Sequence, residues 1–128
     1  MGFMGLDNWV GSDNAADLMC NVLSKLGQML LDRVEEADNC YNTQGWIDVA
    51  LIAEALLINN PELFMHIDDE LRNALSIARK YSKQMLDNMS VEEELYRDIQ
   101  RMYNNLNTIL KPVDEYILEE RKYLKTNE

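Results

Sequence analysis

The sequence predicts an all-α fold, a single-domain antiparallel bundle of about five helical segments with a glycine-rich lid loop at its N-terminus. Three observations favour this class. Apolar residues recur at steps of three and four along most of the 128-residue chain. The chain has only two prolines and five glycines, so few positions interrupt a helix. No segment shows the alternation of apolar and polar residues that is typical of a half-buried strand.

Residues 1–12 are interpreted as the folded lid. Three of the five glycines lie there, and Trp9 lies between the last two of them. A glycine-rich loop before a helix can bind phosphate through its backbone N–H groups. However, no Lys or Arg occurs from Met1 to Leu23, and Asp13 and Asp17 would repel an anion. We therefore expect a structural lid in which Trp9 packs on the bundle.

The first helix is predicted over residues 13–37, with Ser12 or Asp13 as its cap. Its apolar stripe advances by steps of four and three and has further leucines beside it. The stripe comprises Ala15, Met19, Val22, Leu26 and Met29, and its neighbours are Leu18, Leu23 and Leu30. Gly27 lies inside this helix and weakens it by about 1 kcal/mol relative to Ala. A glycine there permits a close crossing with another helix.

Residues 46–58 form the most apolar segment, and a helix without a polar face belongs in the middle of a bundle. Pro61 is expected to start a short helical turn over residues 61–66. The next helix is predicted over residues 69–86, with Asp68 or Asp69 as its cap. Its inward residues are expected to be Leu71, Ala74, Leu75, Ala78, Tyr81 and Met85.

The last helical stretch is predicted over residues 91–125. It begins at a capping box, Ser90 to Glu93, in which a hydroxyl and a carboxylate satisfy backbone N–H groups reciprocally. An apolar seam over 95–116 then advances by steps of four and three, through Leu95, Ile99, Met102, Leu106, Ile109, Val113 and Tyr116. Pro112 has no N–H to donate, so a kink or a short break is expected near it. This seam is also the predicted surface for a homo-oligomer.

The formal net charge of −11 is concentrated in one part of the chain. Residues 32–70 hold ten acidic residues and one basic residue, a net charge of −9. Such a charge argues against direct contact with nucleic-acid phosphates or with an anionic membrane surface. The acids are interpreted either as a solvated surface that aids solubility or as a face that recognises a basic partner.

The sequence shows no catalytic or metal-binding constellation. His66 is the only histidine. Glu62 precedes it by four residues, but no second His and no Glu-x-x-His pair accompanies it. Cys20 and Cys40 lack the spacing of a zinc site, and we expect free thiols in a reducing cytoplasm. We therefore expect no catalytic residue, no metal and no cofactor, and the apolar run from Trp46 to Ile58 is too short to span a membrane.

Glu54 stands in the middle of the most apolar segment. A buried carboxylate must be paired, hydrogen-bonded or protonated. We expect Glu54 to be a structural anchor that bonds loop N–H groups or an arginine such as Arg72 or Arg79. An exposed position on a narrow polar stripe is the alternative, and a catalytic role has little support because no second acid shares its helix face.

Three N-terminal features form a pattern: spaced glycines, an aromatic residue, and an Asp-Ala-Asp stretch that opens the first helix. They are carried by Gly2, Gly5, Trp9, Asp13, Ala15, Ala16 and Asp17. Together with the alanine-rich run 50–57 around Glu54, this pattern resembles the family called domain of unknown function 4259, made of small bacterial proteins. The chain departs from the family at Met4, where a tryptophan is expected. The resemblance implies an α-helical domain and no known activity.

These observations predict a small, acidic, non-enzymatic cytoplasmic protein that acts by binding another protein. One alternative is an acidic inhibitor that imitates nucleic acid and occupies a DNA- or RNA-handling protein in phage–host conflict. A second alternative is an enzyme that uses Glu54 or the cluster around His66. The candidate interaction or structural positions are Trp9, Asp13, Asp17, Glu54, Glu62, Asp68, Asp69 and Glu70.

The lid interpretation is tested by replacing Trp9→Ala. We expect a lower melting temperature in a thermal unfolding experiment, because the indole would lose its burial against the bundle. Unchanged stability combined with lost partner binding would instead make Trp9 a contact residue and contradict the lid.

Overall fold

The computed structural model describes residues 13–42 and 45–126, and these hold helices and turns without a strand. The elements in chain order are α2 (Asp13–Ala37), α3 (Trp46–Asn59), the 3₁₀ helix η2 (Pro61–His66), α4 (Asp69–Asn88) and α5 (Tyr96–Thr126). The predicted all-α helical bundle is confirmed. The predicted lid over residues 1–12, with Trp9, lies outside the described residues.

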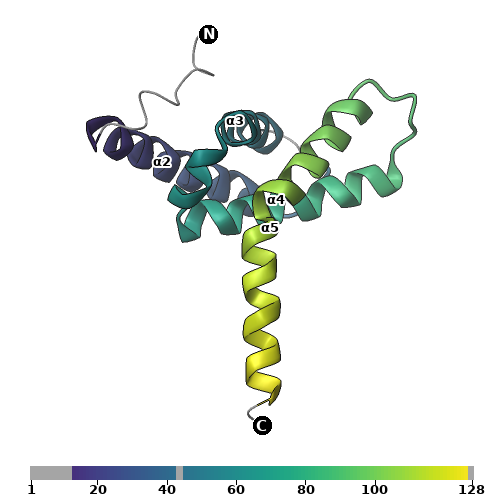
Figure 1. The fold of residues 1–128 in the computed structure, drawn as a ribbon. Coiled ribbons are helices and arrows are strands. Elements are labelled where there is room, and N and C mark those ends of the chain that lie inside the picture. The colour runs from purple at the N-terminus through teal and green to yellow at the C-terminus, as the bar shows by residue number, and fades with distance from the viewer. Residues whose placement is uncertain (1–12, 43–44, 127–128) are drawn as a thin grey trace.

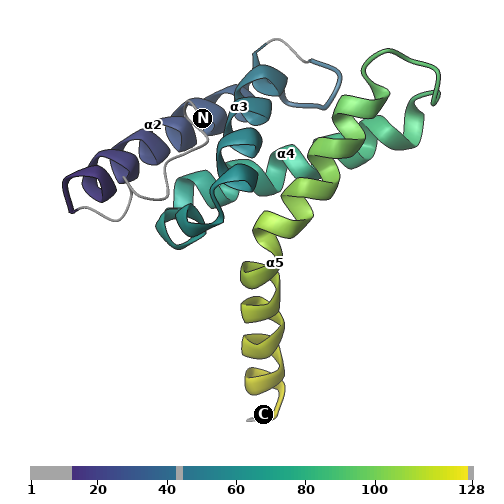
Figure 2. The same cartoon turned by 45° about the horizontal axis from the view of Figure 1, so that its top comes forward.

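Helices α2 and α4 pack against each other and run in the same direction (Figures 1 and 2). Contacts between them advance together along both helices. Gly27 approaches Leu71, and further along the backbone oxygen of Val34 accepts a hydrogen bond from the Tyr81 hydroxyl. Helix α3 connects them by returning the chain from the end of α2 toward the start of α4. The first half of α5 packs on α4 and α3 (Figure 1).

At Gly27 the backbones of α2 and α4 approach so closely that a side chain would not fit. A Cβ at this position would lie 2.8 Å from the backbone nitrogen of Leu71 and 2.9 Å from its Cα. Backbone atoms cannot swing aside as a flexible side chain can. The prediction that Gly27 permits a close helix crossing is therefore confirmed.

The buried face of α2 differs from the predicted stripe. Ala15 and Met19 are buried, but Val22 is 39% exposed and Met29 is 50% exposed. The buried positions beyond Met19 are instead Leu23, Leu30, Val34 and Ala37. These residues lie on the same side of the helix as Gly27, so the close approach to α4 sets the rotation of α2 and turns the predicted stripe partly outward.

Helix α3 places Trp46 at the junction with α4. Trp46 is fully buried, and its ring meets that of Tyr81 edge-on, with centroids 5.5 Å apart. The Tyr81 hydroxyl donates to Val34 at 3.2 Å, and burial, followed by the charge of Asp38, raises the pKa of Tyr81. Helix α3 is not covered on every side, however, because Ile52 is 57% exposed.

Helix α4 follows the prediction closely. The carboxylate of Asp68 accepts the backbone N–H of Leu71 at 2.8 Å, so Asp68 is the cap. The predicted inward residues are buried, with Tyr81 half-buried. Ser82 is also buried, and its hydroxyl donates to the Ala78 carbonyl at 2.7 Å, which satisfies this polar group inside the core. The helix continues to Asn88, beyond the predicted end at residue 86.

The predicted start of the last helix is wrong, since α5 begins at Tyr96 and residues 91–95 form turns. The contacts of the capping box do form: Glu93 accepts the Ser90 N–H at 2.8 Å, and the Ser90 hydroxyl accepts the Glu92 N–H at 3.3 Å. The side chains of residues 91–95 are exposed, so no core contact stabilises a helical turn there.

Of the kink or short break predicted near Pro112, the break does not occur, because α5 continues through Pro112. The missing N–H is accommodated by a change in the direction of the helix instead, and Figures 1 and 2 show its second half turning away from the other helices. In the first half, the seam residues Ile99, Met102, Leu106 and Ile109 are buried within the chain. A second copy could not reach them without unpacking α5.

Replacing Gly27→Ala tests the close crossing. Overpacking costs about 1–3 kcal/mol, which exceeds the gain of about 1 kcal/mol from helix propensity. We expect the free energy of unfolding in urea to fall by up to about 2 kcal/mol. The matched control is Gln28→Ala at the exposed neighbouring position, which should change stability by less than about 0.5 kcal/mol. A Gly27→Ala variant more stable than the parent would contradict the crossing.

Candidate functional site

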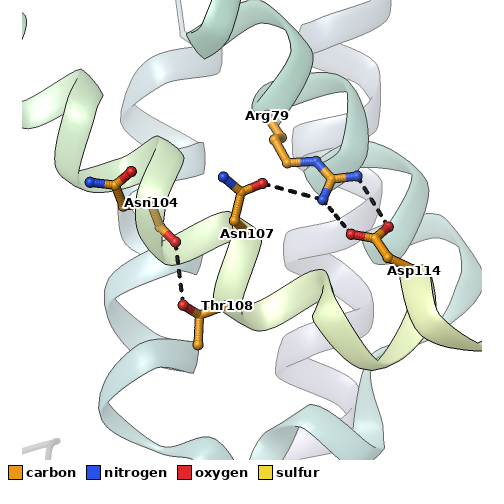
Figure 3. Close-up of polar contacts among 5 residues, drawn as sticks. All are labelled: Arg79, Asn104, Asn107, Thr108 and Asp114. Atoms are coloured by element: carbon orange, nitrogen blue, oxygen red, sulfur yellow. Dashed lines mark hydrogen bonds and ion pairs between the residues drawn. The ribbon is translucent and has the colours of Figure 1, made fainter.

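Arg79 of α4 holds α5 on both sides of Pro112 (Figure 3). Its Nη1 donates to Asp114 Oδ2 at 2.8 Å and to Asn107 Oδ1 at 3.4 Å, and its Nη2 donates to Asp114 Oδ1 at 3.3 Å. A two-pronged contact between a guanidinium and a carboxylate fixes direction as well as distance. We call these three residues the Arg79 clasp; it sets the direction in which the following part of α5 leaves the bundle.

Residues 115–126 of α5 form an arm that extends away from the other helices (Figure 2). Leu118 is 56% exposed. The other side chains described in the arm are exposed as well, namely Glu115, Glu119, Glu120, Arg121 and Lys122. The arm spans roughly 18 Å at the rise of an α-helix. An isolated helix of this length is marginally stable in water, so its order depends on the Arg79 clasp and on the packed half of α5.

An apolar cavity of 310 Å³ lies where the arm leaves the bundle. We call it the root cavity; η2, the start of α4 and the α5 segment from Ile109 to Pro112 line it. Phe64, Met65 and Ile67 supply apolar walls from η2 and the residue after it, and Arg72 is the charged member of the lining. Met65 is exposed. A protein that packed along the arm would meet this apolar surface at the same time.

Glu54 is 3% exposed, and it accepts a hydrogen bond of 2.5 Å from Asn105 Nδ2 on α5. The expectation of an anchor bonded to an arginine is wrong in its partner, because Arg72 pairs with Asp69 and Arg79 pairs with Asp114. Helix α5, rather than a loop or α4, supplies the bond to Glu54. The residues described around this carboxylate form a cavity of 360 Å³ whose lining has no second acid and no histidine.

The structure brings His66 against Cys20, a pair that sequence reasoning missed. Cys20 Sγ lies 3.4 Å from His66 Nδ1, and the two residues are 46 positions apart. Glu62, the predicted neighbour of His66, has its Oε1 shielded from solvent without a hydrogen-bond partner in the described part of the chain. Among residues 13–42 and 45–126, no group of three or more His, Cys, Asp or Glu side chains could hold a metal ion.

Eight of the ten acidic residues of the stretch 32–70 lie in two groups, and the other two, Glu54 and Glu62, are buried and half-buried. One group surrounds the end of α2 and the start of α3, and comprises Asp32, Glu35, Glu36, Asp38 and Asp48. The other lies at the start of α4, where Asp68 caps the helix, Asp69 pairs with Arg72 and Glu70 is exposed. Because Leu71 meets α2 at Gly27, the two groups are separated by roughly 16 Å along the axis of α2.

The acids at the end of α2 do not stabilise that helix. The C-terminus of a helix is the negative end of its dipole, so each nearby carboxylate destabilises the helix by about 0.3–1 kcal/mol. No basic residue occupies the last turn of α2. This end of the molecule therefore carries an unfavourable concentration of negative charge that a basic surface of another molecule would neutralise.

The remaining predicted positions are less informative. Asp17 is exposed on α2, and Asp13 opens that helix. The side chain of Asp13 and all of Trp9 lie outside the described residues. In the part of the chain that the structure describes, no helix has the length and apolar character needed to cross a membrane.

The role of Glu54 as an anchor is tested by replacing Asn105→Ala. Removing the amide leaves a buried carboxylate without its donor, which costs about 1–3 kcal/mol. We expect that loss in the free energy of unfolding measured in urea. The matched control is Asn104→Ala at the neighbouring exposed position, with a change below about 0.5 kcal/mol. Equal effects of the two replacements would show that the Glu54 contact does not stabilise the fold.

Comparison of the chain with protein-family models, with curated proteins and with solved structures found no match. The resemblance to the domain of unknown function 4259 family therefore stays a prediction.

Proposed function

We propose that the chain is a small, acidic, non-enzymatic protein-binding module, and that the arm of α5 is its contact surface for a partner protein. The observation that carries this proposal is that the arm leaves the bundle in a direction fixed by the Arg79 clasp, with its described side chains exposed. A helix presented in this way can lie in a groove or pack against another helix.

The energetics of the arm favour a partner. A short helix in water is marginal, whereas packing along a second surface would bury apolar side chains such as Leu118. The root cavity lies beside the point of departure, so the same partner could insert an apolar side chain between η2 and α5. The arm and the root cavity together form one continuous candidate interface.

The charge of the chain favours a partner with basic groups. The net charge of −11 repels nucleic acid and anionic lipid, and attracts a positively charged protein surface. Cys20 and Cys40 are free thiols, which fits a reducing compartment. A cytoplasmic location is therefore part of this proposal.

The alternatives have weaker support. An imitation of nucleic acid needs carboxylates at regular spacing on one face, whereas eight of the ten acids of residues 32–70 lie in two separate groups. An enzyme using Glu54 would need a second polar group able to accept or deliver a proton beside it. Its cavity has only arginine and asparagine as further polar groups.

The arm is tested by introducing a photo-reactive amino acid at Leu118 in the full chain, expressed in its native cells. The matched control is the same residue at Ile52 of α3, because the two side chains are 56% and 57% exposed. We expect a discrete cross-linked protein from position 118 and none from position 52, since only the arm contacts the partner.

The recovered protein is then purified and its affinity is measured with two variants. Leu118→Asp should weaken binding about tenfold or more, as for a central interface residue, and Ile52→Asp should leave binding unchanged. Both variants should remain folded, because exposed replacements usually change stability by less than about 0.5 kcal/mol. Equal cross-linking at both positions, or equal affinities of the two variants, would contradict the proposal. A cross-link between two copies of the chain would make the partner a second copy.

A further inference from the structure

The contact between Cys20 and His66 places a nucleophile beside a base. Cys20 lies on α2 and His66 is the last residue of η2, and Sγ lies 3.4 Å from Nδ1. Both side chains are half-buried, so the pair is partly accessible to solvent. The thiol can donate its proton to Nδ1, and a thiolate so formed can accept a hydrogen bond back from the imidazolium.

This arrangement has the chemical signature of an activated thiol. The thiolate is the reactive form of cysteine, and only a few per cent of an ordinary thiol is ionised near neutral pH. A neighbouring imidazole that takes the proton raises that fraction. We propose that Cys20 is a site of reversible modification, whose thiol, activated by His66, exchanges with low-molecular-weight disulfides.

The exchange step is balanced. His66 Nδ1 takes the proton of the Cys20 thiol, and the thiolate attacks one sulfur of a small disulfide. A new S–S bond forms between Cys20 and that sulfur, the original S–S bond breaks, and the other half leaves as a thiolate that takes up the proton. The small disulfide is the oxidant, and a free small thiol reverses the step.

An external disulfide is needed because Cys40 cannot serve as the partner. Cys40 follows the end of α2, and the helix between the two cysteines spans roughly 25 Å. A disulfide needs Cα atoms within about 7 Å of each other. Cys40 is also 3% exposed, so it provides an unreactive control thiol within the same chain. The proposal does not depend on the arm, since Cys20 and His66 belong to α2 and η2.

The test treats the full chain with glutathione disulfide at neutral pH and follows each cysteine by mass spectrometry. We expect Cys20 to form the mixed disulfide and Cys40 to remain a thiol. Replacing His66→Gln should slow the reaction of Cys20 about tenfold or more, because the base that takes the thiol proton is removed. Protection of Cys40 in the variant reports that the fold is intact.

A second readout does not need a His66 variant. The far-ultraviolet absorbance of the thiolate at neutral pH should be higher in the parent chain than in Cys20→Ser. An unmodified Cys20, or equal rates in the parent and His66→Gln with Cys40 protected, would overturn the proposal. If His66→Gln exposed Cys40, the absorbance comparison would decide, and equal absorbance of the parent and Cys20→Ser would also overturn it.

Discussion

The close approach of α2 to α4 at Gly27 is the constraint on which the rest of the structure depends. Because a Cβ there would lie 2.8 Å from the Leu71 backbone, the two helices meet backbone to backbone at this point. The contact fixes the rotation of α2 and its register against α4. That register places Val34 within reach of Tyr81 and brings η2 alongside the first part of α2, where His66 meets Cys20.

The sequence was sufficient to predict what local spacing determines. It predicted the class of fold, the Asp68 cap, the inward face of α4 and the buried seam of α5 from Ile99 to Ile109, because these depend on a helix burying its most apolar stripe. It failed on α2, where apolar residues occur on more than one side. Only the tertiary contact at Gly27 decides which side is buried.

The candidate site was harder to predict for the same reason. The apolar neighbours of Glu54 left both a buried and an exposed position open, and its bond to Asn105 depends on which helix crosses α3. The contact of Cys20 with His66 joins residues 46 positions apart, so no local pattern in the sequence indicates it. The arm could not be predicted because the apolar seam continues past Pro112 in the sequence, whereas the second half of α5 turns away from the other helices (Figure 1).

The central claim is that a rigid body organised around Gly27 carries an arm that extends away from the other helices. Native-state hydrogen exchange tests both halves of this claim at once. Amides of α2 and α4 flanking Gly27 and Leu71 should exchange only through global unfolding, and amides of residues 119–126 should exchange orders of magnitude faster. Arm amides as protected as those of α2 in the isolated protein would contradict the account, as would rapid exchange beside Gly27.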